Sequence, residues 1–349
     1  MKNTFLLLIA CCLTFASCED LGAIINGIEN GENTENTDNN ENDGNNDGDE
    51  STDVPADLPT FAYTSEDDIK ASVDLAYDAL RKYIDYQKIV ENTIIIEKNF
   101  ESITPYNANI DKMWKSGYEA IAVANKCIRS LEKSIEIFGQ EVVDKYLGTC
   151  NAVIGFIYKD MVEHWGNIPI ITPESSVSEF HPTAMENEVR AYCAERLELG
   201  RKLLEVQNTF INDQMTVQTT MLALAEAKYY DYHIGREMCR IVLDMENTEE
   251  IIYTVTGFES HNKIIIYTKK YAELLLAEYS YYLGLVNEAG GDLPQIISRW
   301  NSNSYGYWSM LKRTNRLVQT IGCPEYMKYL PIPASELANN PNLMQNPGY

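Results

Sequence analysis

The last twenty residues of the chain, 330-LPIPASELANNPNLMQNPGY-349, are rich in proline and asparagine and yet carry regularly placed apolar side chains. Pro331 and Pro333 fix φ and predict an extended backbone, and Asn340 is disfavoured from a helix because proline follows it. Residues 346–348, Asn-Pro-Gly, are typical of a turn. Proline also lowers the entropy lost on ordering. We therefore predict an irregular segment pinned against the body, with one helical turn at 335–337. Its apolar contacts would be Leu330, Ile332, Leu337, Leu343 and Tyr349.

The body before this segment has the apolar spacing of helices. Ser65, followed by three acidic residues, predicts a helix start, and its stripe is Ile69, Val73, Ala76, Leu80 and Ile84. Similar stripes run from Trp114 to Ile128 and from Leu147 to Met161. Gly284 suits a helix C-terminus. Further helices are predicted at residues 187–206, 217–231, 234–246, 268–283 and 289–299.

Strand signals are few. The segments EIIYTVTG (250–257) and KIIIYT (263–268) predict a short hairpin, or the second leads into the next helix. The rest of the body indicates a mainly α fold. Helix pairs of similar length favour a tetratricopeptide-like repeat scaffold, in which each pair stacks on its neighbour. A regular 34-residue period is not visible in the sequence.

The first twenty residues, MKNTFLLLIACCLTFASCED, have the layout of an export signal. Lys2 precedes an apolar run, Phe5–Phe15, which is too short to span a bilayer and suits a signal peptide. Small residues before Cys18 resemble a bacterial lipoprotein signal, in which Cys18 is lipidated. We predict a signal peptide at 1–17; ordinary secretion with cleavage elsewhere is the alternative. Acidic residues directly after Cys18 resemble a cue for display on the cell surface.

An acidic tether follows the predicted lipidation site. Residues 29–53 hold ten acidic and no large apolar residues, so they cannot bury enough surface to fold. We predict a lipidated cysteine and flexible tether at 18–53 and a single body at 54–349. Residues 1–53 hold twelve acidic residues and one lysine, so −11 of the total charge of −24 lies there. The remaining acidic body argues against nucleic acid as a partner.

The sequence offers no recognised catalytic motif. It has no glycine-rich phosphate loop, no nucleophile elbow and no HExxH, and its four histidines are scattered. We therefore predict a binding protein without catalysis, metal or cofactor. Five cysteines fall in the predicted body without metal-ligand spacing, and we expect buried thiols, with one disulfide left open. They are Cys127, Cys150, Cys193, Cys239 and Cys323.

Aromatic residues are abundant, with 23 tyrosines and four tryptophans. Sugars present apolar C–H faces to aromatic rings, and their hydroxyls need polar partners such as asparagine. Two segments, 99–114 and 299–313, combine both residue types without helical periodicity. We predict ligand contacts from each segment, although tyrosines at helix interfaces are the alternative. The candidates are Phe100, Tyr106 and Asn107 in the first segment, and Trp300, Tyr305, Tyr307 and Trp308 in the second.

The C-terminal segment also carries a family resemblance. LPIPASE (330–336) with NPNLMQNPGY (340–349) closely resembles the C-terminal signature of the SusD/RagB family, surface lipoproteins of the Bacteroidetes that bind nutrients. Earlier segments agree in order: WKSGYEAIAVAN (114–125), WGNIPII (165–171) and KYAELLLAE (270–278). Lys270 departs from the family's usual arginine and so lacks its bidentate fork. We assign Trp165, Asn125 and the C-terminal motif to structure.

The resemblance implies a helical scaffold that docks on a SusC-type TonB-dependent β-barrel in the outer membrane. The lipoprotein would act as a hinged lid that captures an oligosaccharide or peptide and delivers it without breaking a bond. Members of the family usually have a long irregular insert before the KYAE-like helix, whereas only residues 248–268 fill that place here. The ligand is therefore less determined than the fold. Two rivals remain: a binder of peptide or another small nutrient, and a mainly structural cap of the barrel.

Overall fold

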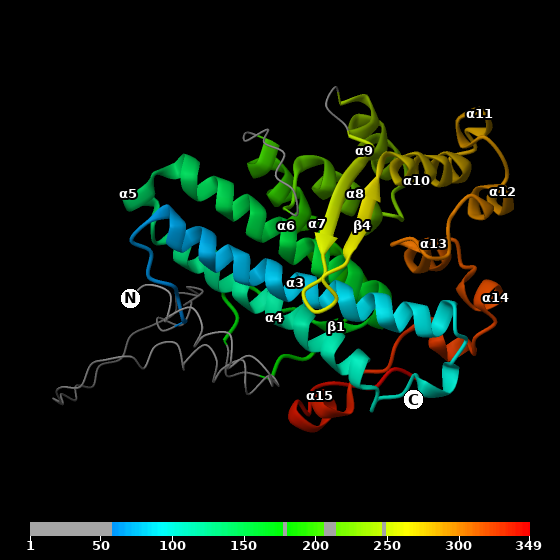
Figure 1. The fold of residues 1–349 in the computed structure, drawn as a ribbon, viewed down its shortest axis with the longest axis horizontal. Coiled ribbons are helices and arrows are strands. Elements are labelled where there is room, and N and C mark those ends of the chain that lie inside the picture. Colours follow the sequence, from blue (N-terminus) through cyan, green and yellow to red (C-terminus); the bar gives the residue numbers. More distant parts are fainter. Residues whose placement is uncertain (1–57, 177–179, 206–213, 246–248) are drawn as a thin grey trace, which may run out of the picture.

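The computed structural model describes residues 58–176, 180–205, 214–245 and 249–349 (Figure 1). The predicted signal peptide, Cys18 and most of the tether lie outside these residues. The elements in chain order are α3 (Glu66–Ile95), η1 (Phe100–Ser102), α4 (Ala108–Glu132), α5 (Ile135–Phe138), α6 (Gln140–Trp165), β1 (Ile168–Pro169), β2 (Thr183–Ala184), α7 (Glu186–Glu205), α8 (Val217–Ala227), α9 (Tyr232–Asp244), β3 (Ile251–Thr256), β4 (Lys263–Thr268), α10 (Lys269–Tyr282), α11 (Val286–Ala289), α12 (Leu293–Ser298), α13 (Tyr307–Arg313), α14 (Leu317–Ile321), η2 (Glu325–Lys328) and α15 (Ala334–Asn339).

The first helix begins where the sequence predicts. Ser65 and Asp68 form a reciprocal capping box, which satisfies N–H groups that the first turn of α3 leaves free. The predicted stripe from Ile69 to Ile84 is buried against α4 and α6. Asn107 caps the next helix, α4. This helix therefore starts before Trp114, the first residue of its predicted apolar stripe.

Helices that follow each other in the chain lie side by side. α3 packs on α4, α4 on α6, α6 on α7, α7 on α8, α8 on α9 and α9 on α10. Figure 1 shows these long helices as one layered stack, with the short helices α11 to α14 at one side of the view and α15 below the stack. The prediction of a mainly α, helical-repeat scaffold is therefore confirmed. Among the described residues, no helix has both the length and the apolar character needed to cross a membrane.

The α6–α7 pair packs most closely at its glycines. A Cβ atom on Gly155 would lie 2.9 Å from the carbonyl oxygen of Cys193. A Cβ atom on Gly200 would lie 2.8 Å from the backbone nitrogen of Ala152. Both clashes are with backbone, which cannot move aside as a side chain can. Glycine is therefore required at this crossing, and the backbones of the two helices touch directly.

The two alternatives for residues 263–268, a hairpin strand and an entry to the next helix, are both correct. β3 and β4 form an antiparallel pair, and β4 runs directly into α10, where Thr268 accepts from Tyr271 N at 3.0 Å as the helix cap. The turn of the hairpin crosses α3 (Figure 1). Asp85 on α3 holds it there by accepting hydrogen bonds from the backbone N–H groups of Glu259 (2.9 Å) and Ser260 (3.3 Å).

Three segments differ from the sequence prediction. The predicted helix at 289–299 begins only at Leu293, as α12. Residue Ala289 ends α11, Gly290 and Gly291 follow with positive φ angles of 67° and 157°, and Asp292 then caps the new helix. The segment 299–313, predicted to be irregular, ends in α13, which begins after Gly306 at φ 79°. The predicted helix at 217–231 stops at Ala227.

The C-terminal segment is fixed against the end of α6, as predicted. The Trp165 indole donates to the Pro331 carbonyl at 2.9 Å. Asn346 donates from its amide nitrogen to the carbonyl oxygens of Trp165 (2.9 Å) and Leu330 (2.7 Å). Asn340 is extended, and Gly348 makes the final turn at φ 99°. These hydrogen bonds satisfy backbone groups that the irregular conformation would otherwise leave buried and unpaired.

Candidate ligand-binding surface and the polar network behind it

The loop between α3 and α4 presents one unshielded aromatic ring. Tyr106 is 85% exposed, the most exposed of the large apolar or aromatic side chains in the described residues. Phe100, in η1, instead lies partly buried against the core. Of the two predicted aromatic contacts in this loop, Tyr106 therefore has its ring free for a ligand, and Phe100 supports the loop from beneath.

Asn107 is occupied as a helix cap. Its side-chain oxygen accepts from the N–H groups of Asn109 (2.9 Å) and Ile110 (3.1 Å), and its amide nitrogen donates to the Ser102 carbonyl at 2.8 Å. These bonds use both ends of the amide. Asn107 therefore fixes the loop that carries Tyr106. Its own amide is already hydrogen-bonded within the protein, so its role is to position the Tyr106 ring.

Polar side chains of two other elements flank the Tyr106 loop. The Pro105 carbonyl accepts from Ala334 N at 2.8 Å, which places the start of α15 beside the loop. Ser335 donates to Asp111 on the first turns of α4. Lys112, on the same turns, lies with its Nζ 5.1 Å from the centre of the Tyr86 ring. We call the surface formed by Tyr106, Asp111, Lys112 and Ser335 the α4–α15 surface.

The second predicted group lies mostly in the core. Trp308 is fully buried and stacks on His164, with ring centres 5.5 Å apart. Tyr305 stacks on Phe156 at 6.2 Å, and Trp300 packs edge-on against Tyr271 at 4.9 Å. The three rings have 7% exposure or less, so they offer no face to a ligand in this structure. The fourth predicted residue, Tyr307, is partly buried against the same core.

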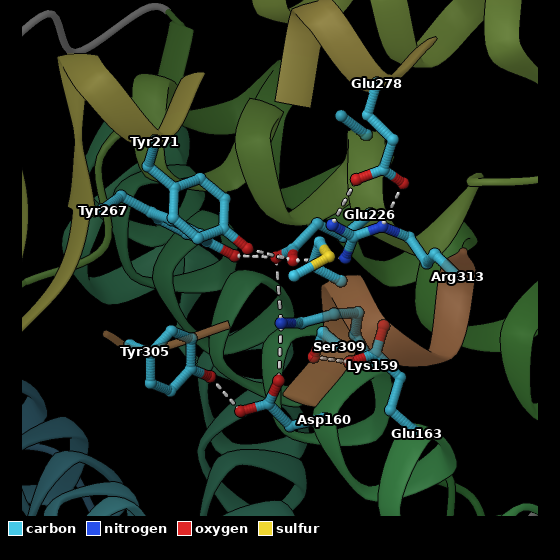
Figure 2. Close-up of polar contacts among 12 residues, drawn as sticks. Lys159, Asp160, Glu163, Glu226, Tyr267, Tyr271, Glu278, Tyr305, Ser309 and Arg313 are labelled. Atoms are coloured by element: carbon cyan, nitrogen blue, oxygen red, sulfur yellow. Dashed lines mark hydrogen bonds and ion pairs between the residues drawn. The ribbon is translucent and has the colours of Figure 1, made fainter. Parts of the chain in front are cut away.

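Behind these aromatic residues lies a fully buried polar network centred on Glu226 of α8 (Figure 2). The Glu226 carboxylate accepts hydrogen bonds from the hydroxyls of Tyr267 and Tyr271. It also pairs with Lys159 of α6 at 3.1 Å and with Arg313 of α13 at 3.0 Å. One carboxylate thus joins α6, α8, α10, α13 and the hairpin.

The charges of this network balance one another. Burial alone would raise the pKa of Glu226, but Lys159 and Arg313 lower it below its usual value. Arg313 also forms a two-pronged pair with Glu278 of α10, at 3.0 and 3.2 Å. Burial raises the pKa of Asp160, which pairs with Lys159, to about 6. Burying such ion pairs carries a desolvation cost, but removing one partner is strongly destabilising because it leaves an uncompensated charge in the core.

The network continues along α6 toward α3. The Ser309 hydroxyl donates to Glu163, and Tyr305 donates to Asp160, as Figure 2 shows. His164 contacts the Asp160 carbonyl at 2.8 Å through Nδ1 and Glu91 of α3 at 3.1 Å through Nε2. Burial alone would lower the pKa of His164, and the Glu91 carboxylate raises it. The segment 300–313 is therefore fastened to the helical stack by aromatic packing and buried charge together.

The polar network around Glu226 is closed to solvent, which defines its role. The side chains of Lys159, Glu226 and Arg313 have at most 2% exposure, so a substrate cannot reach them without unfolding of the surrounding helices. No group of three or more His, Cys, Asp or Glu residues in the described ranges could hold a metal ion. The arrangement is a structural clamp, and the exposed ring among the predicted site residues is Tyr106, on the α4–α15 surface.

No protein-family model matches the chain, and no curated protein matches it by sequence. Its fold, however, matches solved structures. A SusD superfamily protein from Bacteroides vulgatus superposes with a TM-score of 0.70 at 14% identity, covering 82% of this chain and 100% of its own. A laminarin-binding SusD-like protein gives 0.65 at 13% identity, with 82% and 100% covered.

A third solved structure is a complex with an oligosaccharide. Surface glycan-binding protein A from Bacteroides thetaiotaomicron, in complex with laminarihexaose, superposes with a TM-score of 0.63 at 14% identity. The superposition covers 81% of this chain and 100% of that one. At such identities the likeness defines the fold and not the ligand. The chain thus has the SusD-like fold that its C-terminal segment predicts.

Proposed function

We propose that this protein is a cell-surface lipoprotein that captures a glycan and delivers it to a SusC-type TonB-dependent transporter in the outer membrane. The observation that carries the proposal is the SusD-like fold with an exposed aromatic ring on the α4–α15 surface. Two structural neighbours have laminarin or laminarihexaose in their descriptions, which favours a glycan over a peptide. The protein binds and releases its ligand without chemistry.

The α4–α15 surface supports this role in physical terms. An exposed tyrosine ring offers its apolar face to the C–H face of a pyranose. Asp111, Lys112 and Ser335, on the adjoining first turns of α4 and α15, would supply acceptors and donors for sugar hydroxyls. Asn107 and the contact between Pro105 and Ala334 hold the loop in place. A preorganised ring and fixed polar neighbours lower the entropy cost of binding.

The N-terminal sequence supports the cellular placement. A lipid on Cys18 would hold the protein at the membrane, and the acidic segment 29–53 would let the body move without leaving. Such an anchor suits a lid that must open and close over a membrane barrel. Two tests follow: mass spectrometry of the mature N-terminus for acylated Cys18, and mild detergent extraction for a β-barrel that copurifies with the protein.

The ligand test uses the chain with Cys18→Ala, which stays soluble without its predicted lipid. Calorimetric titration compares laminarihexaose, maltohexaose and a mixed tripeptide panel. We expect one glycan to bind and the peptides to give no heat. Binding of peptides alone would assign the chain to the peptide rival. A folded protein that binds none of these probes, but still copurifies with a barrel, would support the structural cap instead.

A further inference from the structure

The ring of His164, near the end of α6, lies where three helices meet. The side chain is fully buried, and Glu91 approaches it from α3. From α13, the Trp308 indole stacks on it with an angle of 9° between the ring planes. The indole N–H of Trp308 is buried and has no hydrogen-bond partner within the part of the chain that the structure describes. Stacking on His164, and not a hydrogen bond, therefore holds this indole against the helical stack.

Both ring nitrogens of His164 face oxygen atoms that accept hydrogen bonds. Nδ1 lies 2.8 Å from the backbone carbonyl oxygen of Asp160, which has no proton to donate. Nε2 lies 3.1 Å from Oε1 of Glu91, and this oxygen also accepts from the Gln87 amide nitrogen at 3.0 Å. A neutral imidazole has one N–H and one bare nitrogen, so it can donate to only one of the two oxygens. An imidazolium, which carries two N–H groups, satisfies both.

The charged groups around the ring favour its protonated form. Glu91 faces it from α3, and Asp160 and Glu163 lie within one turn of it on α6. From α13, Lys312 donates to the Glu163 backbone carbonyl at 2.7 Å. The C-terminal segment contributes a backbone N–H, which binds the His164 carbonyl at 2.7 Å. Burial lowers the pKa of His164, but Glu91 and Asp160 outweigh it and raise the pKa above its ordinary value of 6.5.

We propose that His164 is a buried imidazolium that acts as a pH-sensitive latch between α13 and the helical stack. In the protonated state the ring donates to Glu91, and its positive charge favours stacking on the electron-rich face of Trp308. Loss of the Nε2 proton would leave two lone pairs facing each other across the 3.1 Å contact with Glu91. Both contacts weaken together. Because the folded-state pKa is raised, the stabilisation is complete below pH 6.5 and is lost as the pH rises through that pKa.

Histidine-selective 15N NMR tests the protonation state directly. The chain with Cys18→Ala is labelled at its four histidines. The signals of His164 are assigned by their contacts with the Trp308 ring and, independently, by their absence from His164→Gln. At pH 7 we expect a proton on each ring nitrogen. Both protons should persist to higher pH than in the same chain unfolded in urea, where histidine titrates near pH 6.5. A bare Nε2 in the folded chain at pH 7 would overturn the proposal.

A pair of variants tests the role of Glu91. Glu91→Gln keeps the size of the side chain and removes its charge, and the new amide can donate to a bare Nε2, so His164 should be neutral at pH 7. Glu97→Gln, which removes an exposed carboxylate just beyond the end of α3, is the matched control and should keep both ring protons. An unchanged His164 spectrum in Glu91→Gln would contradict the assigned partner and so overturn the latch.

Hydrogen exchange in residues 307–313 tests the opening of α13. Exchange rates corrected for their intrinsic pH dependence give the equilibrium constant for local opening. In the wild type this constant should rise above pH 6.5, by about tenfold for each unit by which the folded-state pKa of His164 exceeds its ordinary value. Two neighbours titrate in the same range: burial raises the pKa of Asp160 to about 6 and lowers that of Lys312 to about 7.

The ratio of the wild-type opening constant to that of His164→Gln at each pH cancels the contributions of Asp160 and Lys312. We expect this ratio to rise with pH, and a constant ratio between about pH 6 and 9 would overturn the latch. If His164→Gln fails to fold, Glu91→Gln takes its place in the ratio, and the wild-type NMR spectrum still decides the protonation state. Neither measurement involves a ligand, so the result is independent of the proposed function.

Discussion

Arg313 of α13 bridges two carboxylates on different helices, Glu226 of α8 at 3.0 Å and Glu278 of α10 at 3.0 Å. The three side chains are almost fully buried. Since α13 is a short helix at the far end of the chain, this one guanidinium fastens it to the helical stack. Arginine suits the place because its rigid fork reaches both partners at once and stays charged when buried.

Replacing Arg313 with methionine should destabilise the protein by about 3 to 5 kcal/mol, because the buried Glu278 would lose its ion-pair partner and Glu226 would lose one of its two. Urea unfolding followed by circular dichroism measures the loss. Lys270→Met is the matched control, since the Lys270–Glu273 pair is exposed and its removal should change stability by about 0.5 kcal/mol or less. Equal stability of Arg313→Met and wild type would show that the clamp is not needed.

Asp160 should make stability depend on pH in a defined window. Burial raises the pKa of its carboxyl from 3.8 to about 6, so the folded state holds this proton more tightly than the unfolded chain does. The resulting stabilisation is complete below pH 4 and is lost as the pH rises through 6. Relative to Asp160→Asn, the wild-type unfolding free energy should fall by about 2 kcal/mol between pH 4 and 7.

Urea unfolding of wild type and Asp160→Asn at matched pH values measures this difference. Comparing the two proteins at each pH cancels the contributions of the titratable groups that they share. An exposed carboxylate provides the control: Glu273→Gln should follow the wild-type pH profile. A constant difference between wild type and Asp160→Asn across the window would contradict the assigned direction of the pKa.

Asn346 should be a stability determinant despite its place in an irregular segment. Asn346→Ala removes the donor that satisfies the carbonyl oxygens of Trp165 and Leu330, and we expect a loss of about 2 kcal/mol. Thermal and urea unfolding provide the measurement. Asn342→Ala, at an exposed hydrogen bond to the Phe180 carbonyl, should cost much less. If the two variants were equally stable, the pinning role of Asn346 would be wrong.

Tyr106 should govern ligand affinity and not stability. Its ring is 85% exposed, so Tyr106→Ala leaves the melting temperature unchanged while weakening the glycan that the calorimetric screen identifies by about tenfold. Tyr230→Ala, which removes another exposed tyrosine on the connection between α8 and α9, is the matched control and should bind normally. Undiminished affinity of Tyr106→Ala would remove the α4–α15 surface from the proposed function.

Local sequence patterns predict much of the fold. Ser65 before three acidic residues, the stripe from Ile69 to Ile84 and Gly284 with its positive φ of 73° act within one or two helical turns. Such signals depend on neighbours in the chain, so they can be interpreted without the tertiary structure. The C-terminal prolines belong to the same class, because proline restricts its own backbone wherever it occurs.

The site could be predicted only in part. Tyr305 and Trp308 lie in a segment rich in Asn, Ser and Gly, which is typical of a polar loop, but both rings are buried. Tyr305 packs between α6 and the hairpin, and Trp308 stacks on His164 of α6. Sequence shows the composition of such a segment and not what packs on it. Glu226 is a further example: it stands alone in an apolar helix, and its partners Lys159 and Arg313 are 67 and 87 residues away.

One signal was present in the sequence. Lys159, Asp160 and Glu163 interrupt an otherwise apolar run along α6, and Glu226 interrupts another along α8. Charged residues on faces that must be buried require partners of opposite charge. Their number indicates that an internal network exists. Choosing which charge pairs with which still requires the three-dimensional arrangement.

The anchoring of residues 330–349 to Trp165 has a consequence for how the protein is made. Residues 330–349 are synthesised after the helices that they contact, and yet they supply hydrogen bonds to the end of α6. The helical stack can form first, but these groups around Trp165 stay unpaired until residues 330–349 dock. A chain interrupted shortly before residue 330 would therefore remain a target for proteases.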